Sequence, residues 1–262
     1  MSDNLQLKIL DGIATVTLNR PEQRNAMNYG MWKGIVDICE QLEKNSDVRV
    51  VLITGAGSDA FSAGADIKEF EQLRSNSSQG RDWGKVLDAA MGSLANLSKP
   101  TISVIKGYCI GGGCELACFT DLRIATDNSS FGIPAARLSI TLGYYETRRI
   151  AQLIGPGNLS YMLMSARLLN AQEALRIGLV NEVLPKEEID AYVSKLTQDI
   201  IRLAPISHKN NKSIIRTVLN NPTFEGLTSE QENLPFEGFD SNDYKEGRLA
   251  FVEKRHPIFK GT

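Results

Sequence analysis

The stretch GYCIGGGCELACFTDLRIAT, residues 107–126, joins an apolar strand to three consecutive glycines and then to one acid, Glu115. Glycines let a ligand approach the backbone without a side chain in the way. The first amides of a helix have no acceptor within the helix, so they can donate to that ligand. The stretch therefore predicts a strand, a tight loop and a helix that together present N–H groups and a carboxylate.

A second loop of this kind is FSAGADIKEF, residues 61–70, where Ala63, Gly64 and Ala65 follow a buried strand and precede a helical segment. If the two loops face each other, their N–H groups form an oxyanion hole. Each such donor contributes on the order of 3 kcal/mol to a developing enolate or alkoxide. Either loop alone could instead be a tight turn that needs glycine for a positive φ.

Strand-like and helical runs alternate from Leu5 to about Pro134, beginning with a hairpin that turns at Asp11-Gly12. From Gly155 onward the segments are mostly helical, and a capping box at Asn170 and Glu173 opens one of these helices. The alternation indicates stacked strand and helix units. We therefore expect an α/β core followed by a smaller helical part.

The composition of the 262 residues, 42% hydrophobic and 23% charged, is typical of a globular protein. A formal net charge of -2 gives no reason to expect nucleic acid or a membrane as partner. The first residues lack the pattern of a secretory or transit leader, and no apolar run reaches the roughly 20 residues of a membrane span. We expect a soluble, cytoplasmic protein.

Two other kinds of site are disfavoured. The run VVLITGAGSDA, residues 50–60, resembles a dinucleotide fingerprint, but no helix is predicted to open after its glycines. Zinc is not implied either, because the only histidines, His208 and His256, lie far from the cysteines. We expect reduced cysteines that serve as small buried side chains, at positions Cys39, Cys109, Cys114 and Cys118.

Several motifs resemble the enoyl-CoA hydratase/isomerase (crotonase) superfamily, in the order of that family and over almost the whole chain. Besides residues 107–126, they are LNRPEQRNAMN (18–28), AFSAGADIKEF (60–70), FGIP (131–134), NAQEALRIGLVNEVLP (170–185) and EGRLAFVEKRHPIFKG (246–261). The resemblance implies an α/β fold of the ClpP/crotonase type, a spiral of repeated ββα units. It implies a core over residues 1–195 and, over residues 196–262, a helical region that forms trimers and covers coenzyme A.

The same resemblance implies an acyl-CoA substrate, no cofactor beyond the coenzyme A of that substrate, and a homotrimer or a dimer of trimers (homohexamer). The oxyanion donors would be the backbone N–H groups of Ala65 and Gly112. The remaining substrate-binding residues would be Arg24, Ala26, Ala63, Asp66, Ile67, Lys68, Gly111 and Tyr144.

Glu115 resembles one of the two catalytic glutamates of the hydratases, although a carboxylate there could instead cap the first turn of its helix. Partial burial would raise its pKa toward a useful range. The second glutamate is missing, because the family pattern FGxPE reads FGIPA here and places Ala135 in that position. Loss of one acid should slow hydration by orders of magnitude unless another group takes its role.

Three replacements are open. Glu146 could bring a carboxylate into the pocket, or it could form a local ion pair with Arg148 and Arg149. Tyr144 or Tyr145 could donate a proton or form a wall of the acyl pocket. Arg137 could bind a carboxylate on the acyl group, or it could be a surface or subunit-contact arginine.

The leading hypothesis is an enzyme that hydrates or isomerises an enoyl-CoA through a stabilised enolate, with Glu115 as acid/base. The alternatives are decarboxylation or thioester hydrolysis in the same superfamily, and a catalytically impaired acyl-CoA-binding or scaffold protein. The basic stretch HKNNKSIIR, residues 208–216, is the one hint of an RNA-associated protein, and a solvated helix face explains it as well.

Overall fold

The computed structural model describes residues 3–221 and 223–262. Its main sheet has six strands in the order β1-β2-β3-β5-β7-β10. All neighbours except the β1/β2 hairpin are parallel. The strands are β1 (Leu5–Leu10), β2 (Ile13–Leu18), β3 (Val50–Gly55), β5 (Thr101–Ile105), β7 (Leu122–Thr126) and β10 (Glu182–Leu184).

The expected hairpin is confirmed, because Asp11 and Gly12 connect β1 to β2 with φ angles of 50° and 79°. Two positive φ angles match the twist of a hairpin, which is why the pair Asp-Gly is favoured there. The expectation that no helix opens after the glycines of residues 50–60 is confirmed, since β3 is followed by the short strand β4 (Ala60–Ser62).

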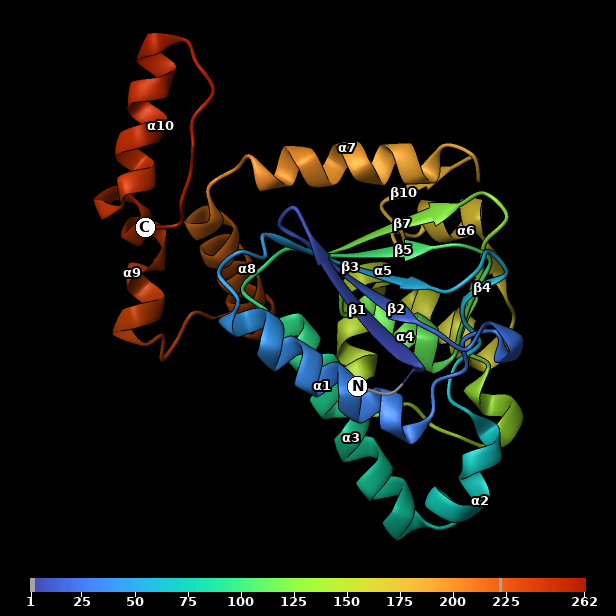
Figure 1. The fold of residues 1–262 in the computed structure, drawn as a ribbon. Coiled ribbons are helices and arrows are strands. Elements are labelled where there is room, and N and C mark those ends of the chain that lie inside the picture. The colour runs from blue at the N-terminus through green and yellow to red at the C-terminus, as the bar shows by residue number, and fades with distance from the viewer. Residues whose placement is uncertain (1–2, 222) are drawn as a thin grey trace.

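Alternate residues of the main sheet pack on opposite faces. On β3, Val51 and Ile53 belong to the large core that also contains residues of α1 (Tyr29–Lys44) and α3 (Ser77–Asn96). Val50 faces the other way, toward Ile189 and Val193 of α7 (Ile189–Ile201). Figure 1 shows α7 on one side of the sheet and α1 with α3 on the other, so both faces are covered, as a parallel sheet requires.

A second sheet of four strands positions the two loops of interest. Its order is β4-β6-β8-β9, and β4, β6 and β8 are mutually parallel. Besides β4, this sheet contains β6 (Tyr108–Ile110), β8 (Ser130–Gly132) and β9 (Leu169–Asn170). Because parallel neighbours end at the same edge, the loops that follow β4 and β6 lie next to each other.

The remaining elements of the described chain are helices joined by loops and turns. After β4 come a short 3₁₀ turn at Ile67–Glu69 and α2 (Phe70–Leu73), and after β6 comes α4 (Gly112–Cys118). A 3₁₀ turn at Ala135–Leu138 precedes α5 (Tyr144–Ser165), which is kinked at Gly155. The expected capping box opens α6 (Ala171–Arg176), where Asn170 and Glu173 exchange hydrogen bonds.

The C-terminal part is helical, as expected, and consists of α8 (Pro205–Asn220), α9 (Ser229–Glu237) and α10 (Asn242–Glu253). In Figure 1, α9 and α10 extend away from the sheets. The predicted division at residue 195 falls inside α7, which runs unbroken across it, so the division remains a prediction. No helix in the described part of the chain is both long and apolar enough to cross a membrane.

Candidate active site

The two glycine-containing loops meet. A β-carbon built on Gly64 would lie 3.4 Å from the nitrogen of Gly112, and one built on Gly112 would lie 3.6 Å from the nitrogen of Ala65. Within residues 3–221 and 223–262, neither of these two nitrogens donates a hydrogen bond to a protein acceptor. Two unused N–H groups therefore lie side by side, which is the arrangement of an oxyanion hole.

At each of the three consecutive glycines, a side chain would be unfavourable for a different reason. Gly111 adopts a φ of 52° with a ψ of -129°, which a side chain would strain. A β-carbon on Gly112 would lie 3.0 Å from the ring of Trp32, and one on Gly113 only 2.5 Å from Cβ of Ser62. Real β-carbons essentially never show a contact as short as the one at Gly113, so this glycine lets α4 pack directly against Ser62 of β4, and Gly112 leaves room for the ring of Trp32.

Hydrogen bonds fix the β4 loop on both sides. The amides of Ala63 and Asp66 donate to the carbonyls of Arg24 and Met27, at 2.9 Å each. The hydroxyl of Ser62 donates to the carbonyl of Asn25 at 2.9 Å and accepts from the amide of Gly64 at 3.1 Å. In the stretch 63–66 the amide of Ala65 is the one left without a described acceptor.

A cavity of about 300 Å³ opens beside these two amides. Its walls come from the β4 and β6 loops, from α2 and α3, and from the segment between β8 and α5. Most of the lining is apolar, and the side chains with charge are Arg74, Asp88, Glu115 and Glu146. A small apolar pocket with few convergent polar groups is typical of a catalytic site.

Glu115 projects into this cavity from α4, and its residue is 8% exposed. Burial raises the pKa of its carboxyl to about 7; the negative charge of Glu146 adds to this, and Arg74 opposes it. A pKa near neutrality lets a carboxyl both accept and release a proton at physiological pH. No described amide donates to the carboxylate, so the structure gives no support to a capping role.

Glu146 lies in the same cavity, at the start of α5, and is 4% exposed. Its Oε2 atom has no hydrogen-bond partner in the described chain. The pKa of its carboxyl is raised, first by burial and then by the neighbouring carboxyl of Asp88. Among the described residues Glu146 forms no ion pair with Arg148 or Arg149. Arg149 donates to the carbonyls of Cys118 and Thr120 instead.

Arg74 supplies the positive charge of the site. It follows α2, and its guanidinium lies 5.0 Å from the ring centre of Phe70 and 5.8 Å from that of Trp83. Burial lowers its pKa, and the charges of Glu115 and Glu146 raise it. The arginine therefore acts electrostatically on both acids, and we take it as their shared counter-charge.

The residues expected along coenzyme A lie on the outer side of the β4 loop or just beyond it. Ala63 and Ile67 line the cavity, and Lys68 is exposed close by. Arg24 is exposed with a φ of 50°, and its guanidinium lies 5.3 Å from the ring centre of Tyr108. Arg24 borders a separate polar hollow and not the cavity of the two acids.

Asp66 and Ala26 serve to hold the loop. One side chain, that of Arg20, donates both to the carbonyl of Ala26 at 2.7 Å and to the carboxylate of Asp66 at 2.8 Å. Burial works to raise the pKa of Asp66, but bonds from Arg20 and from the amide of Lys68 outweigh it, and the pKa is lowered. Asp66 is therefore an ionised, fully engaged group.

Three expected residues are not brought into the cavity. Tyr144 is 97% exposed and does not line it, so its contact with the substrate stays a prediction. Tyr145 packs against Phe119 instead, at 5.0 Å between ring centres. Arg137 donates to the carbonyl of Ala166 at 2.7 Å and ties the segment before α5 to the end of that helix.

Three further residues, Arg74, Asp88 and Trp83, line the cavity although no sequence motif indicated them. Arg74 follows a single-turn helix, and no recognisable sequence motif includes it. A signal for the α3 wall exists in the spacing of Gly80, Gly84 and Asp88, which recur every four residues on one helix face, and all three line the cavity.

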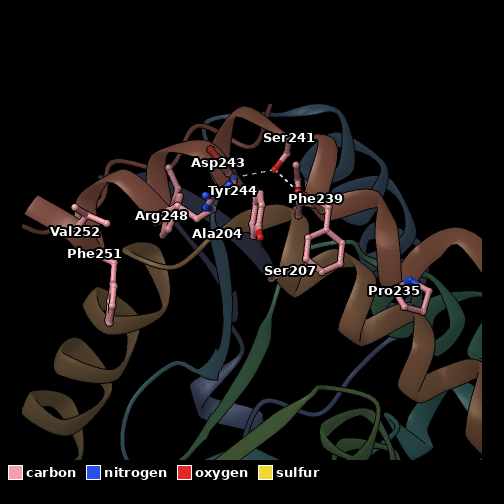
Figure 2. A pocket seen from close by; sticks show the side chains of 14 residues that line it. Ala204, Ser207, Pro235, Phe239, Ser241, Asp243, Tyr244, Arg248, Phe251 and Val252 are labelled. Atoms are coloured by element: carbon pink, nitrogen blue, oxygen red, sulfur yellow. Dashed lines mark hydrogen bonds between the residues drawn. The ribbon is translucent and has the colours of Figure 1, made fainter.

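A larger hollow of about 630 Å³ lies among the C-terminal helices α8, α9 and α10. Figure 2 shows the aromatic side chains of its lining. The ring centres of Phe239 and Tyr244 are 5.0 Å apart, and the guanidinium of Arg248 lies over the ring of Tyr244. The one carboxylate of the hollow, Asp243, already accepts from the amides of Lys260 and Gly261. Because this acid is engaged, none of the described residues gives the hollow a free carboxyl group, and we take the cavity of Glu115 and Glu146 as the candidate active site.

The chain was compared with known proteins. Residues 8–262 match the family model described as enoyl-CoA hydratase/isomerase. The short-chain-enoyl-CoA hydratase of Clostridium acetobutylicum is 36% identical over 253 residues, 97% of this chain and 96% of that protein. The crotonyl-CoA hydratase of Syntrophomonas wolfei is 33% identical, covering 98% of each chain.

Solved structures agree. The crystal structure of an enoyl-CoA hydratase/carnithine racemase from Magnetospirillum magneticum has a TM-score of 0.96 with this chain at 35% identity, and covers 100% of this chain and 97% of that one. The expected crotonase-type fold is thereby confirmed. The chain belongs to the enoyl-CoA hydratase/isomerase family and is an enzyme of that family.

Proposed function

We propose that this enzyme adds water to the double bond of a 2-enoyl-CoA thioester, with Glu115 and Glu146 as its two acid–base groups. The observation that carries the proposal is Glu146, a second buried carboxyl with one oxygen unpartnered, in the cavity that holds Glu115. The thioester carbonyl oxygen would accept hydrogen bonds from the amides of Ala65 and Gly112. Relatives named enoyl-CoA and crotonyl-CoA hydratase support this substrate class.

In this mechanism Glu115 takes a proton from water, and the water oxygen forms a bond to the β-carbon. The electron pair of the double bond moves toward the carbonyl, and the resulting enolate oxygen is held by the two amides. Glu146 then gives a proton to the α-carbon. A raised pKa suits this role, because it keeps the carboxyl of Glu146 protonated until the enolate forms.

The position normally occupied by the second glutamate is Ala135, which lines the same cavity. Because alanine leaves that part of the wall free of charge, the acid of Glu146, one element further along the chain, can serve the same space from α5. In this proposal Glu146 supplies the second carboxyl that Ala135 cannot. A site with two acids favours hydration, which uses two, over isomerisation, which needs one.

Coenzyme A would run past the exposed side of the β4 loop, along Ala63, Ile67 and Lys68, toward Arg24. No separate cofactor is part of the proposal. We also propose a cytoplasmic trimer or dimer of trimers, built through the C-terminal helices. Large exposed apolar side chains there support such an interface, with Phe251 at 87% and Val252 at 78% exposure.

The test mixes the purified enzyme with crotonyl-CoA and follows the loss of absorbance of the conjugated thioester. We expect rapid loss with the native chain, and a kcat about 10²- to 10⁴-fold lower for Glu115→Gln and for Glu146→Gln. Glu71→Gln serves as the matched control, because Glu71 is an exposed glutamate of α2 outside the cavity. It should retain the native rate.

Full activity of Glu146→Gln would show that the second acid is not Glu146. Conversion of a 3-enoyl-CoA into the conjugated thioester, with no reaction of crotonyl-CoA, would make the enzyme an isomerase. If neither thioester reacts while both raise the melting temperature, the proposed function is wrong, and a malonyl-type thioester would test decarboxylation next.

A further inference from the structure

One wall of the cavity carries a charged side chain that has no role in the mechanism proposed so far. One face of α3 forms this wall, where Gly80, Gly84 and Asp88 follow one another at intervals of four residues. A β-carbon built on either glycine would touch nothing within 4 Å. The wall therefore has two positions without side chains and then a single carboxylate.

Asp88 differs from the other acids of the cavity in its exposure. It is exposed to solvent on α3 and at the same time lines the cavity, whereas Glu115 and Glu146 are 8% and 4% exposed. Asp88 and Glu146 both line the cavity, and the neighbouring carboxyl of Asp88 raises the pKa of Glu146. Two carboxyl groups can form a hydrogen bond only when one of them carries a proton.

The mechanism proposed above creates a need for such a contact. At the end of each hydration, Glu115 holds the proton taken from water and Glu146 has lost the one given to the α-carbon. Glu115 must release a proton and Glu146 must gain one before the next turnover. Glu146 is buried and its Oε2 has no partner in the described chain, so it needs a neighbour that reaches solvent.

We propose that Asp88 is a positioning residue that shares one proton with Glu146 between turnovers and returns a proton from solvent to it after each turnover. Water protonates Asp88, Asp88 passes the proton to Glu146, and Glu115 releases its proton to solvent. The net change is therefore the addition of one water to the thioester. This proposal rests on the proposed function, and it fixes Glu146 as the acid and Glu115 as the base.

The charged and titratable surroundings of Glu146 agree with this assignment. Arg74 faces it from the end of α2 and lowers its pKa, whereas Asp88 from α3 raises it. Glu115 faces it from α4. On α5 itself, Arg149 is turned to backbone carbonyls. Asp88 is thus the charged neighbour that favours a proton on Glu146, besides Glu115.

The first experiment measures kcat and kcat/KM for crotonyl-CoA against pH in the native enzyme and in Asp88→Asn. An asparagine removes the negative charge and donates a hydrogen bond, both of which favour ionised Glu146. In the pH profile of kcat, we expect the alkaline limb to move to lower pH by about one unit. At pH values above this limb, kcat should then fall about tenfold, with KM little changed. Asp88→Glu should restore the native profile.

Asp82→Asn is the matched control, because Asp82 is also an exposed aspartate of α3 but pairs with Lys85 outside the cavity. Its pH profile should superimpose on the native one. If the profile of Asp88→Asn also superimposes on it, the proposal is overturned. Normal thermal unfolding of the variants would show that the comparison concerns folded protein.

A second readout needs no activity. Carbon-13 in the glutamate carboxyls gives a titration curve for Glu146, assigned by the signal that Glu146→Gln removes. Asp88→Asn should shift this curve to lower pH. A shift in an enzyme that leaves crotonyl-CoA unchanged would refute the proposed hydration but support proton sharing. An unshifted curve would refute the sharing, whatever the enzyme's activity.

Discussion

Replacing the buried glutamate Glu115 should make the protein more stable above neutral pH. Glu115 is 8% exposed, and burial raises the pKa of its carboxyl from 4.5 to about 7. Below pH 4.5 the carboxyl is protonated in the folded and the unfolded chain alike. Between pH 4.5 and 7 only the unfolded chain ionises, so stability is lost as the pH rises through this window.

The size of the loss follows from the same values. A difference of one pKa unit between the folded and the unfolded chain is worth about 1.4 kcal/mol. A pKa raised from 4.5 to about 7 therefore lowers the free energy of unfolding by on the order of 3 kcal/mol at pH 8. Most of this cost, about 2.5 kcal/mol, develops between pH 5 and pH 8. For chains near this size it corresponds to about 5–10 °C in melting temperature.

Glutamine has nearly the shape of glutamate but does not titrate, so Glu115→Gln removes this dependence. Urea unfolding gives the free energy of unfolding of both proteins at pH 5 and at pH 8. The quantity to compare is the free-energy difference between variant and native chain, and how much it changes from pH 5 to pH 8. We expect the variant to gain about 2.5 kcal/mol relative to the native chain over this interval, although it is nearly inactive.

Glu40 provides the control, as an exposed glutamate on α1 whose replacement by glutamine should alter stability equally at both pH values. If the difference between Glu115→Gln and the native chain were the same at pH 5 and pH 8, Glu115 would not be the buried, neutral-pH acid described here. The acid–base role derived from its burial would then lose its physical basis.

Two further predictions concern the supports of the site. Gly113→Ala would place a β-carbon 2.5 Å from Cβ of Ser62; we expect a loss of about 1–3 kcal/mol in unfolding free energy and a fall in kcat of about 10²-fold, because the displaced serine holds the β4 loop. Lys212→Met would break the ion pair of 2.7 Å that joins α8 to Asp121; we expect about 1–3 kcal/mol of destabilisation with KM unchanged, measured by urea unfolding and steady-state kinetics.

Gly157→Ala is the control for the glycine variant, because a β-carbon on this exposed residue of α5 meets nothing within 4 Å. It should be neutral in both assays. A Gly113→Ala variant with native kcat and stability would contradict the packing argument. A drop in acyl-CoA affinity in Lys212→Met would show that the pair Lys212–Asp121 affects the site and not only the attachment of α8.

The backbone of the site could be predicted from the sequence because its determinants are local. Three glycines, small residues after β4 and the Asp11-Gly12 turn each require a particular backbone path, and short-range sterics enforce it. Two loops after buried strands therefore indicated an oxyanion hole if they faced each other, and the family resemblance pointed to the amides of Ala65 and Gly112. That the loops do face each other depends on β4 and β6 being parallel neighbours, which no local pattern encodes.

The side chains of the site were harder to predict, because their environment is tertiary. Glu146 is flanked by Arg148 and Arg149, and the sequence left a local ion pair open, but Arg149 reaches across to the carbonyls after α4 and leaves the acid in the cavity. Tyr144 stands two residues away and is nevertheless exposed, since neighbouring positions of a helix point in different directions.

The hydrogen bonds of the stretch 63–66 have a consequence for solvent exchange. Its amides at 63, 64 and 66 are bonded to protein acceptors, and the amide of Ala65 is not. In deuterated solvent this single amide should exchange its hydrogen much faster than its neighbours, although Ala65 is half-buried. A bound thioester would protect it, so one peptide group would report occupancy without any label on the substrate.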